Sequence, residues 1–181
     1  MATGIVLSIA WVGLVVAFIR GVVVRRSRLR AVEALEPDAF AFRFATYGEY
    51  GPALESLPRP MLEPASPTIE RYQAVTATRS GLTIWRERPY LPVARIPWAS
   101  ILEIEVTTPT YRAGLSSRSY PSVAITVAGP TTNVIVPFLS ANAGYWWRAT
   151  SVGDAQFIVD RLRRLRKEGT SERSAEHNVP R

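Results

Sequence analysis

Residues 4–24 form an apolar run in which Arg20 is the only charged residue. As an α-helix, a run of this length spans roughly 31 Å, which is close to the hydrocarbon thickness of a bilayer. Its Leu, Ile, Val and Phe side chains each favour insertion by about 0.3 to 0.6 kcal/mol, which outweighs a cost of about 3 kcal/mol for one arginine. Arg20 lies near one end, where its alkyl stem can follow the lipid to the headgroups. The run therefore predicts a transmembrane helix.

A cluster of arginines follows the apolar run directly and sets the predicted topology. A secretory signal peptide carries its positive charge before the apolar run, whereas the cations here come after it. By the positive-inside rule, the N-terminus lies outside and the remainder of the chain lies in the cytoplasm. We therefore expect a single-pass protein of the cell membrane, with the helix continuing through residues 25–36 to Pro37. A cleaved signal peptide and a buried core helix are the two alternatives.

The basic cluster is also the first candidate binding site. Each arginine near an anionic bilayer surface adds about 1 kcal/mol of attraction. The residues expected to contact lipid headgroups are Arg20, Arg25, Arg26, Arg28 and Arg30. A plainer alternative is that these arginines only orient the anchor, since positive flanks are usual beside a helix of this topology.

The composition is consistent with one compact domain after the anchor. Residues 38–168 are enough for a single core, and the net charge of +7 is concentrated at the two ends of the chain. The absence of cysteine agrees with a reducing compartment. Five prolines within residues 51–68 predict an irregular loop there. Residues 169–181 are polar and lack periodicity, which predicts a disordered tail.

Short alternating runs predict a mainly β domain. Phe40, Phe42 and Phe44 alternate with small or polar residues, which is typical of a half-buried strand. Further runs of strand character cover residues 72–78, 82–86, 93–96, 101–107, 122–128 and 133–138. A short Gly-containing link separates residues 72–78 from residues 82–86, and another separates residues 122–128 from residues 133–138. This arrangement predicts two hairpins.

The run at residues 101–107 shows the clearest alternation. Its buried face is expected to carry Leu102, Ile104 and Val106, and its solvated face Glu103 and Glu105.

One amphipathic helix is predicted after the strands. Ser151 precedes Asp154 by three residues, a spacing typical of a capping box. The apolar stripe expected to face the core consists of Ala155, Ile158, Leu162 and Leu165. Arg161, Arg164 and Lys167 lie off that stripe. They form a solvated face in one interpretation, and contact an acidic partner, a membrane surface or nucleic acid in the others.

Several segments resemble the bacterial pleckstrin-homology-like domains that occur next to membrane helices. The resemblance rests on residues 81–85 and 95–101, the strand at 102–106, the paired strands and the final helix, and it spans residues 69–168. It implies a PH-like barrel of about seven antiparallel strands with the C-terminal amphipathic helix across one open end, and a role in binding protein or lipid headgroups. The first hairpin lacks a Lys-x-Arg-type phosphate clamp, and Phe157 is the only large aromatic residue of the final helix.

The residue inventory argues against catalysis. The only histidine, His177, lies in the polar tail, and the chain has no cysteine, so nucleophile–histidine pairs and His- or Cys-based metal sites are not expected. No Gly-rich phosphate loop is present. Glu103 and Glu105 could serve as acid–base groups, but their spacing on one strand favours a solvated face. We predict no catalytic residues, no metal site and no cofactor; an enzyme using carboxylates and arginines is the alternative.

A cluster of adjacent aromatic residues is the second candidate binding site. Consecutive side chains diverge, so at least one of them is expected at a barrel rim, in a ligand groove or at the membrane interface. The candidate partner-binding rim consists of Tyr145, Trp146, Trp147 and Arg148. The alternative is that two of these side chains pack in the core.

Taken together, these features predict a non-enzymatic single-pass membrane protein that presents a PH-like domain at the cytoplasmic face. Its expected partners are anionic lipid and an unidentified protein, and nucleic acid is not expected. The alternative is an accessory or scaffold subunit of a larger membrane protein complex, in which the anchor packs through small residues.

Overall fold

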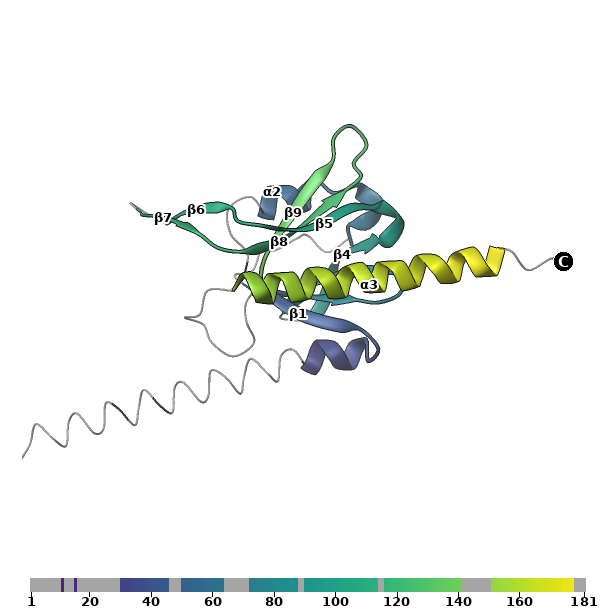
Figure 1. Cartoon of the computed structure of the whole chain (residues 1–181), viewed down its shortest axis with the longest axis horizontal. Coiled ribbons are helices and arrows are strands. Elements are labelled where there is room, and N and C mark those ends of the chain that lie inside the picture. Colours follow the sequence, from purple (N-terminus) through teal and green to yellow (C-terminus); the bar gives the residue numbers. More distant parts are fainter. Residues whose placement is uncertain are drawn as a thin grey trace, which may run out of the picture.

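The computed structural model describes Trp11, Val15 and residues 30–45, 50–63, 72–87, 90–113, 116–140 and 151–177. Within these residues the chain is mainly β, with one long helix at its C-terminal end (Figure 1). In chain order, the named elements are β1 (Phe40–Ala45), α2 (Tyr50–Glu55), η1 (Arg59–Met61), β2 (Tyr72–Ala77), β3 (Gly81–Glu87), β4 (Tyr90–Pro97), η2 (Trp98–Ser100), β5 (Ile101–Thr107), β6 (Thr110–Ala113), β7 (Ser116–Ser119), β8 (Ser122–Val127), β9 (Val134–Ser140) and α3 (Val152–His177).

Seven strands form one antiparallel sheet in the order β4-β3-β2-β1-β9-β8-β5. One half is the meander from β1 to β4, and the other half is made of β5, β8 and β9. The halves are joined by a short ladder in which Phe44 pairs with Ser140 and Ala45 with Leu139. Strands β6 and β7 form a separate two-stranded ribbon. The first strand of the domain is thus hydrogen-bonded to the last.

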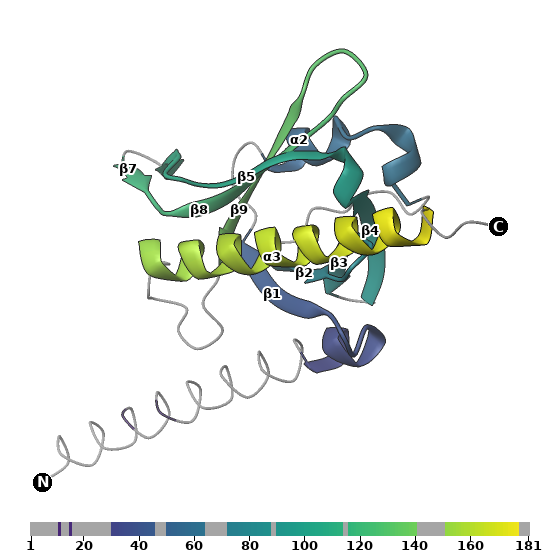
Figure 2. The ribbon, with the colours of Figure 1, turned by 45° about the vertical axis from the view of Figure 1, so that its right-hand side comes forward.

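Helix α3 lies across the inner side of the sheet, with β1 on one side and β5 on the other in both ribbon views (Figure 2). Its start is the predicted capping box: the Asp154 backbone N–H donates to Ser151 Oγ at 3.1 Å, and the Ser151 backbone N–H donates to Asp154 Oδ2 at 3.2 Å. The predicted apolar stripe is confirmed, because all four of its side chains are at most 7% exposed. The cap and the stripe together fix α3 on the core.

The predicted closed barrel is wrong. Strands β4 and β5 are the two edges of the seven-stranded sheet and are not paired with each other. Strand β4 contains Pro92 and ends at Pro97, and neither residue has a backbone N–H to offer a neighbouring strand. The 3-10 turn η2 then leads the chain into β5. The sheet is therefore joined between its halves at β1 and β9 and open between its two edge strands, β4 and β5.

The edge of β5 is covered by side chains of α3 instead of by a strand. The Arg163 guanidinium donates from Nε and Nη2 to the carbonyl oxygen of Ile104, at 3.0 and 2.7 Å. The Arg166 guanidinium donates from Nη1 to the carbonyl oxygen of Leu102 at 3.3 Å. These contacts satisfy edge carbonyls that would otherwise accept hydrogen bonds from another strand.

The predicted transmembrane helix is also corrected. Within the residues that the structure describes, no helix is long and apolar enough to cross a bilayer. The longest described helix, α3, is amphipathic and carries charged residues along its exposed side. The single-pass topology and the cell-membrane location predicted from residues 4–24 are therefore not supported. Of that segment only Trp11 and Val15, both helical, belong to the described residues.

The predicted strands are found close to their expected positions, but an irregularity in β5 changes which of its residues face the core. A β-bulge lies between Ile101 and Glu103 where β5 pairs with β8. The bulge turns Leu102 outward, so its side chain is 48% exposed instead of buried, whereas Ile104 is buried as predicted. Glu103 and Glu105 are exposed, as predicted.

Two segments predicted to be irregular contain helix. Within the proline-rich stretch at 51–68, residues from Tyr50 to Glu55 form α2. Pro52 lies in its first turn, where a missing N–H leaves no helix hydrogen bond unmade, and Leu54 is fully buried. The predicted disordered tail at 169–181 is helical through His177, because Gly169 does not end α3.

Candidate binding surface

The two sites predicted from the sequence lie almost entirely outside the described residues. Of the basic cluster only Arg30 is described; it is helical and exposed. Tyr145, Trp146, Trp147 and Arg148 lie outside the described residues. The lipid contact of the cluster and the aromatic rim both stay predictions.

The acidic side chains of the described part of the chain do not gather into a metal site. No cluster of three or more His, Cys, Asp or Glu side chains there is arranged to hold a metal ion. Glu103 and Glu105 pair across the ladder with Thr126 and Ala124 of β8, so neither carboxylate meets another across the sheet. The aromatic and cationic side chains on the surface of α3 are the remaining candidates for a site.

A row of aromatic rings leads from the core to the surface. Phe42 and Phe44 of β1 each contact Phe138 of β9, with ring centroids 6.2 and 4.8 Å apart. At the other end of β1, Phe40 contacts Phe42 at 5.8 Å and reaches Phe157 of α3 at 6.2 Å, edge to face. Edge-to-face contacts of this kind are a favoured arrangement for aromatic pairs.

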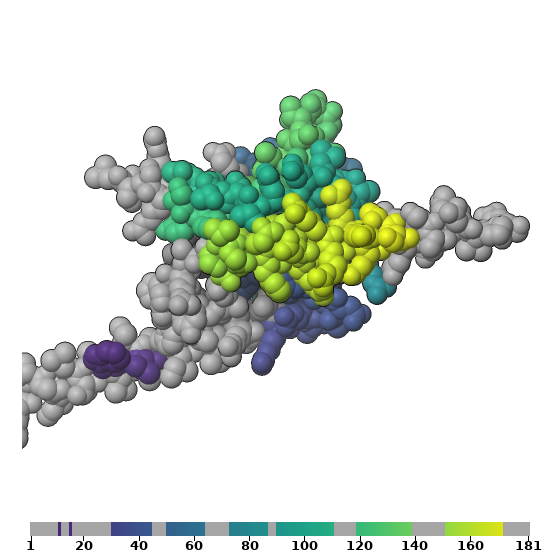
Figure 3. Space-filling model, in the orientation of Figure 1, coloured from purple at the N-terminus to yellow at the C-terminus, as the bar shows by residue number. Residues whose placement is uncertain are grey.

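Phe157 is the exposed end of this row. Its side chain is 64% exposed, although it belongs to the helix that anchors the core. It lies one residue before the buried Ile158 and therefore about 100° around the helix from it, outside the apolar stripe. In the space-filling view α3 forms an exposed ridge, with residues 30–45 beside it (Figure 3). A large apolar ring is thus held at the surface by a rigid element.

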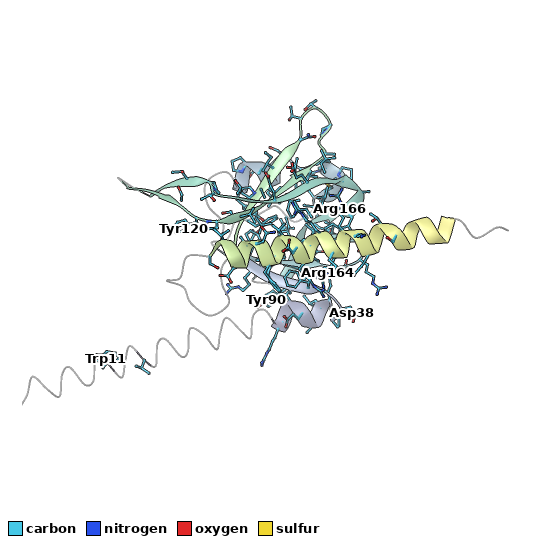
Figure 4. The ribbon with its side chains drawn as sticks, viewed as in Figure 1. Trp11, Asp38, Tyr90, Tyr120, Arg164 and Arg166 are labelled. Carbon is cyan, nitrogen blue, oxygen red and sulfur yellow. The ribbon has the colours of Figure 1, made fainter. Side chains whose placement is uncertain are left out.

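Cations lie next to Phe157 on the same side of α3. Residues four and seven positions further along a helix lie on one face with the first, which brings Arg161 and Arg164 into line with Phe157. Figure 4 shows Arg164 on the side of α3 towards β1 and Arg166 on the side towards β5. We call the group made of Phe40, Phe157, Arg161 and Arg164 the Phe157 surface.

The five cations between positions 161 and 167 of α3 fall into two groups. Arg163 and Arg166 donate to the backbone of β5, as described above. The side chains of Arg161, Arg164 and Lys167 make no hydrogen bond or ion pair within the described part of the chain. The first group has a structural role, and the second is available for an external acceptor.

A buried polar pair lies at the other end of the aromatic row. The Tyr50 hydroxyl donates to Gln73 Oε1 at 2.5 Å, and both side chains are at most 1% exposed. Burial raises the pKa of the Tyr50 hydroxyl far above its ordinary value. Because the ring contacts Phe44 and Phe138 and the hydroxyl is closed off from solvent, this pair is part of the core rather than a binding site.

This buried hydroxyl predicts a loss of stability at alkaline pH. The unfolded chain releases the Tyr50 proton near the ordinary tyrosine pKa of about 10, whereas the folded chain retains it to a higher pH. The contribution of Tyr50 to stability is therefore complete below about pH 10 and decreases by about 1.4 kcal/mol for each pH unit above it.

Urea unfolding at several pH values checks this prediction against Tyr50→Phe. The variant should be less stable at neutral pH by about 1 to 3 kcal/mol, because Gln73 Oε1 loses its donor, and it should lose less stability than the native chain above pH 10. Parallel losses in the two proteins would show that the hydroxyl is not buried in solution.

Comparisons with known proteins yield no relative: no family model, no curated protein and no solved structure matches this chain. The function assigned to the Phe157 surface therefore rests on the geometry of that surface alone.

Sequence reasoning found part of this surface. It placed Arg161 and Arg164 off the apolar stripe and noted Phe157 as the only large aromatic of the helix. The contact with Phe40 was missed, because the two residues are far apart in the chain and meet only when α3 crosses the sheet. The sequence did contain one signal for this surface. Phe157 is a large aromatic residue at a helix position outside the apolar stripe, where a core residue is not expected.

Proposed function

We propose that this chain is a non-enzymatic binding module for a protein partner and that the Phe157 surface is its contact site. The observation that carries the proposal is Phe157, which is 64% exposed while its ring rests on the half-buried Phe40. Covering a phenylalanine side chain contributes on the order of 1.5 to 3 kcal/mol, so the exposed ring is a site where a partner gains affinity.

The composition of the surface supports a protein as the partner. Aromatic residues and arginine are enriched at the centre of protein interfaces and dominate their binding energy. The capping box and the buried stripe of α3 hold Phe157 in place before any contact is made, which reduces the entropy lost on binding. Two sequence-based suggestions stay predictions: a PH-like relationship and a scaffold role in a larger complex. A membrane anchor is not part of the proposed function.

Site-specific photo-crosslinking in cells tests the proposal. A photoreactive phenylalanine analogue replaces Phe157 in the full-length chain, and a second variant carries it at Ile135, which is similarly exposed (57%) but lies on β9. We expect a discrete protein adduct at position 157 and none of the same mass at position 135. The adduct is identified by mass spectrometry, and its protein component is purified for a direct binding measurement.

The purified partner then allows a quantitative prediction. Phe157→Ala should weaken binding by about tenfold or more, as expected for an aromatic residue at the centre of an interface, while the midpoint of urea unfolding changes little. Ile135→Ala is the matched control and should leave the affinity unchanged. Equal affinities of the native chain and Phe157→Ala, or the same adduct from both crosslinking positions, would refute the proposed site.

A further inference from the structure

The charges beside Phe157 define what kind of partner fits this surface. Arg161 is half-buried and Arg164 is exposed, and neither has a recorded hydrogen bond or ion pair in the described part of the chain. Asp160 lies four residues before Arg164, but its carboxylate accepts from the side-chain amide of Gln156 at 2.8 Å, and no ion pair joins it to Arg164. The two guanidinium groups therefore have no internal acceptor, in contrast to those of Arg163 and Arg166.

We infer that the Phe157 surface binds an acidic amphipathic segment of a partner protein, with an apolar side chain on Phe157 and Phe40 and carboxylates on Arg161 and Arg164. This inference rests on the proposed function and specifies the partner chemistry. Guanidinium groups pair with carboxylates through two parallel hydrogen bonds, which gives directional recognition in addition to attraction.

The helix spacing sets the spacing of groups in the partner. Along α3, Arg161 lies about 6 Å and Arg164 about 10.5 Å beyond Phe157, given a rise of about 1.5 Å per residue. A partner helix matches these distances with an apolar residue followed by acidic residues four and seven positions later. The matching sequence pattern is therefore an apolar residue, three residues of any type, an acid, two residues of any type and a second acid.

A peptide fits this surface better than a phosphate polymer does. Binding along a nucleic acid backbone relies on many cations in a continuous track, because each neutralised phosphate adds to the affinity. On α3 the cations are interrupted by Asp160 and Glu168, and two of the five in the cluster are occupied by β5. Two available arginines next to an aromatic ring suit a short segment with discrete carboxylates.

Fluorescence anisotropy with the full-length protein tests the inference. The probe is a labelled helical peptide that carries leucine and two glutamates at the spacing given above, and its control has glutamine at both glutamate positions. The glutamate peptide should bind at least about tenfold more tightly than the glutamine peptide. Its affinity should fall when NaCl is raised from about 0.05 M to about 0.5 M, which shortens the screening length from roughly 14 Å to roughly 4 Å.

Charge reversal locates the contact. Arg161→Glu/Arg164→Glu should lose the glutamate peptide and bind a peptide with lysine at the same two positions. Arg59→Glu/Arg95→Glu changes the net charge equally at two exposed arginines that belong to η1 and β4 instead of α3, and it should bind the glutamate peptide like the native chain. Circular dichroism and the unfolding midpoint of each variant confirm that the fold is kept, because all four side chains lie outside the buried core.

Three results would overturn the inference. They are equal affinity for the glutamate and glutamine peptides, equal losses in the two double variants, and tighter binding of single-stranded DNA or of vesicles rich in anionic lipid than of the peptide. The crosslinking at position 157 does not depend on charge. A discrete adduct whose partner lacks acidic segments would therefore refute the acidic partner and leave the proposed function intact.

Discussion

Leu162→Asp is expected to abolish folding of the domain. The Leu162 side chain is fully buried in the centre of the apolar stripe of α3, against the core between the two halves of the sheet. Replacement removes a contribution of about 2 to 5 kcal/mol and places a carboxylate where no cation or donor is available in the surrounding cluster. Since domains of this size are stable by about 5 to 15 kcal/mol, the variant should be unfolded or nearly so at room temperature.

Circular dichroism and urea unfolding of the full-length protein measure this effect. Val152→Asp is the matched control, because Val152 is 61% exposed and a carboxylate in the first turn of a helix interacts favourably with the helix dipole. The control should keep the native unfolding midpoint within about 0.5 kcal/mol. A cooperative transition of Leu162→Asp at the native midpoint would mean that α3 is not docked on the sheet.

Gly169→Ala is expected to destabilise the protein, although alanine is the better helix former. Gly169 is buried where α3 passes the turn between β2 and β3, and a Cβ atom there would collide with the carbonyl oxygen of Arg79. The same Cβ atom would lie only 3.1 Å from Trp98 Cδ1. Trp98 is itself fixed, because its indole N–H donates to the Thr78 carbonyl oxygen at 2.9 Å. The overpacking should cost about 1 to 3 kcal/mol.

Gly153→Ala in the same helix provides the control for this substitution. Gly153 is exposed, and a Cβ atom would meet only Ser151 Oγ at 3.7 Å, an ordinary contact. This variant should gain up to about 1 kcal/mol from helix propensity. Urea unfolding should therefore give changes of opposite sign for the two substitutions. A gain in stability for Gly169→Ala would contradict the close approach of α3 to the β2–β3 turn.

Local sequence patterns predicted the elements of the fold well where a single physical rule applied. The alternation of Phe40, Phe42 and Phe44 identified β1, and the hydroxyl of Ser151 three residues before Asp154 identified the start of α3. In both cases the residues that determine the outcome are neighbours in the chain. Side-chain periodicity and capping act within one turn or one strand, so the sequence is sufficient.

Predictions that required distant residues were less successful. Leu102 follows the alternation of its strand, but the bulge opposite Thr126 of β8 turns it outward. Gly169 has the features of a helix end, but it serves the packing of α3 against Arg79. A closed barrel would require β4 to pair with β5. Whether these strands pair depends on how the two edges of the sheet are covered.

The candidate site shows the same limit. The off-stripe position of Arg161 and Arg164 could be read from the helix periodicity, but the sequence could not show that Arg163 and Arg166 bind the edge of β5. The membrane prediction depended on hydropathy within residues 4–24 alone, and no described helix supports it. The pairing of Phe40 with Phe157 depends on the arrangement of the whole sheet.

The pairing of β1 with β9 determines how the chain can fold during synthesis. Strands β1 to β4 are consecutive and can form their meander as soon as they emerge from the ribosome. The second edge of β1 has to wait for β9, and the edge of β5 has to wait for α3, which follows β9 in the chain. Both edges are therefore exposed together between the synthesis of β5 and that of β9, and exposed edges are sites of mispairing. Because these closing contacts join distant parts of the chain, we expect folding to be slow and completed only once α3 has been synthesised.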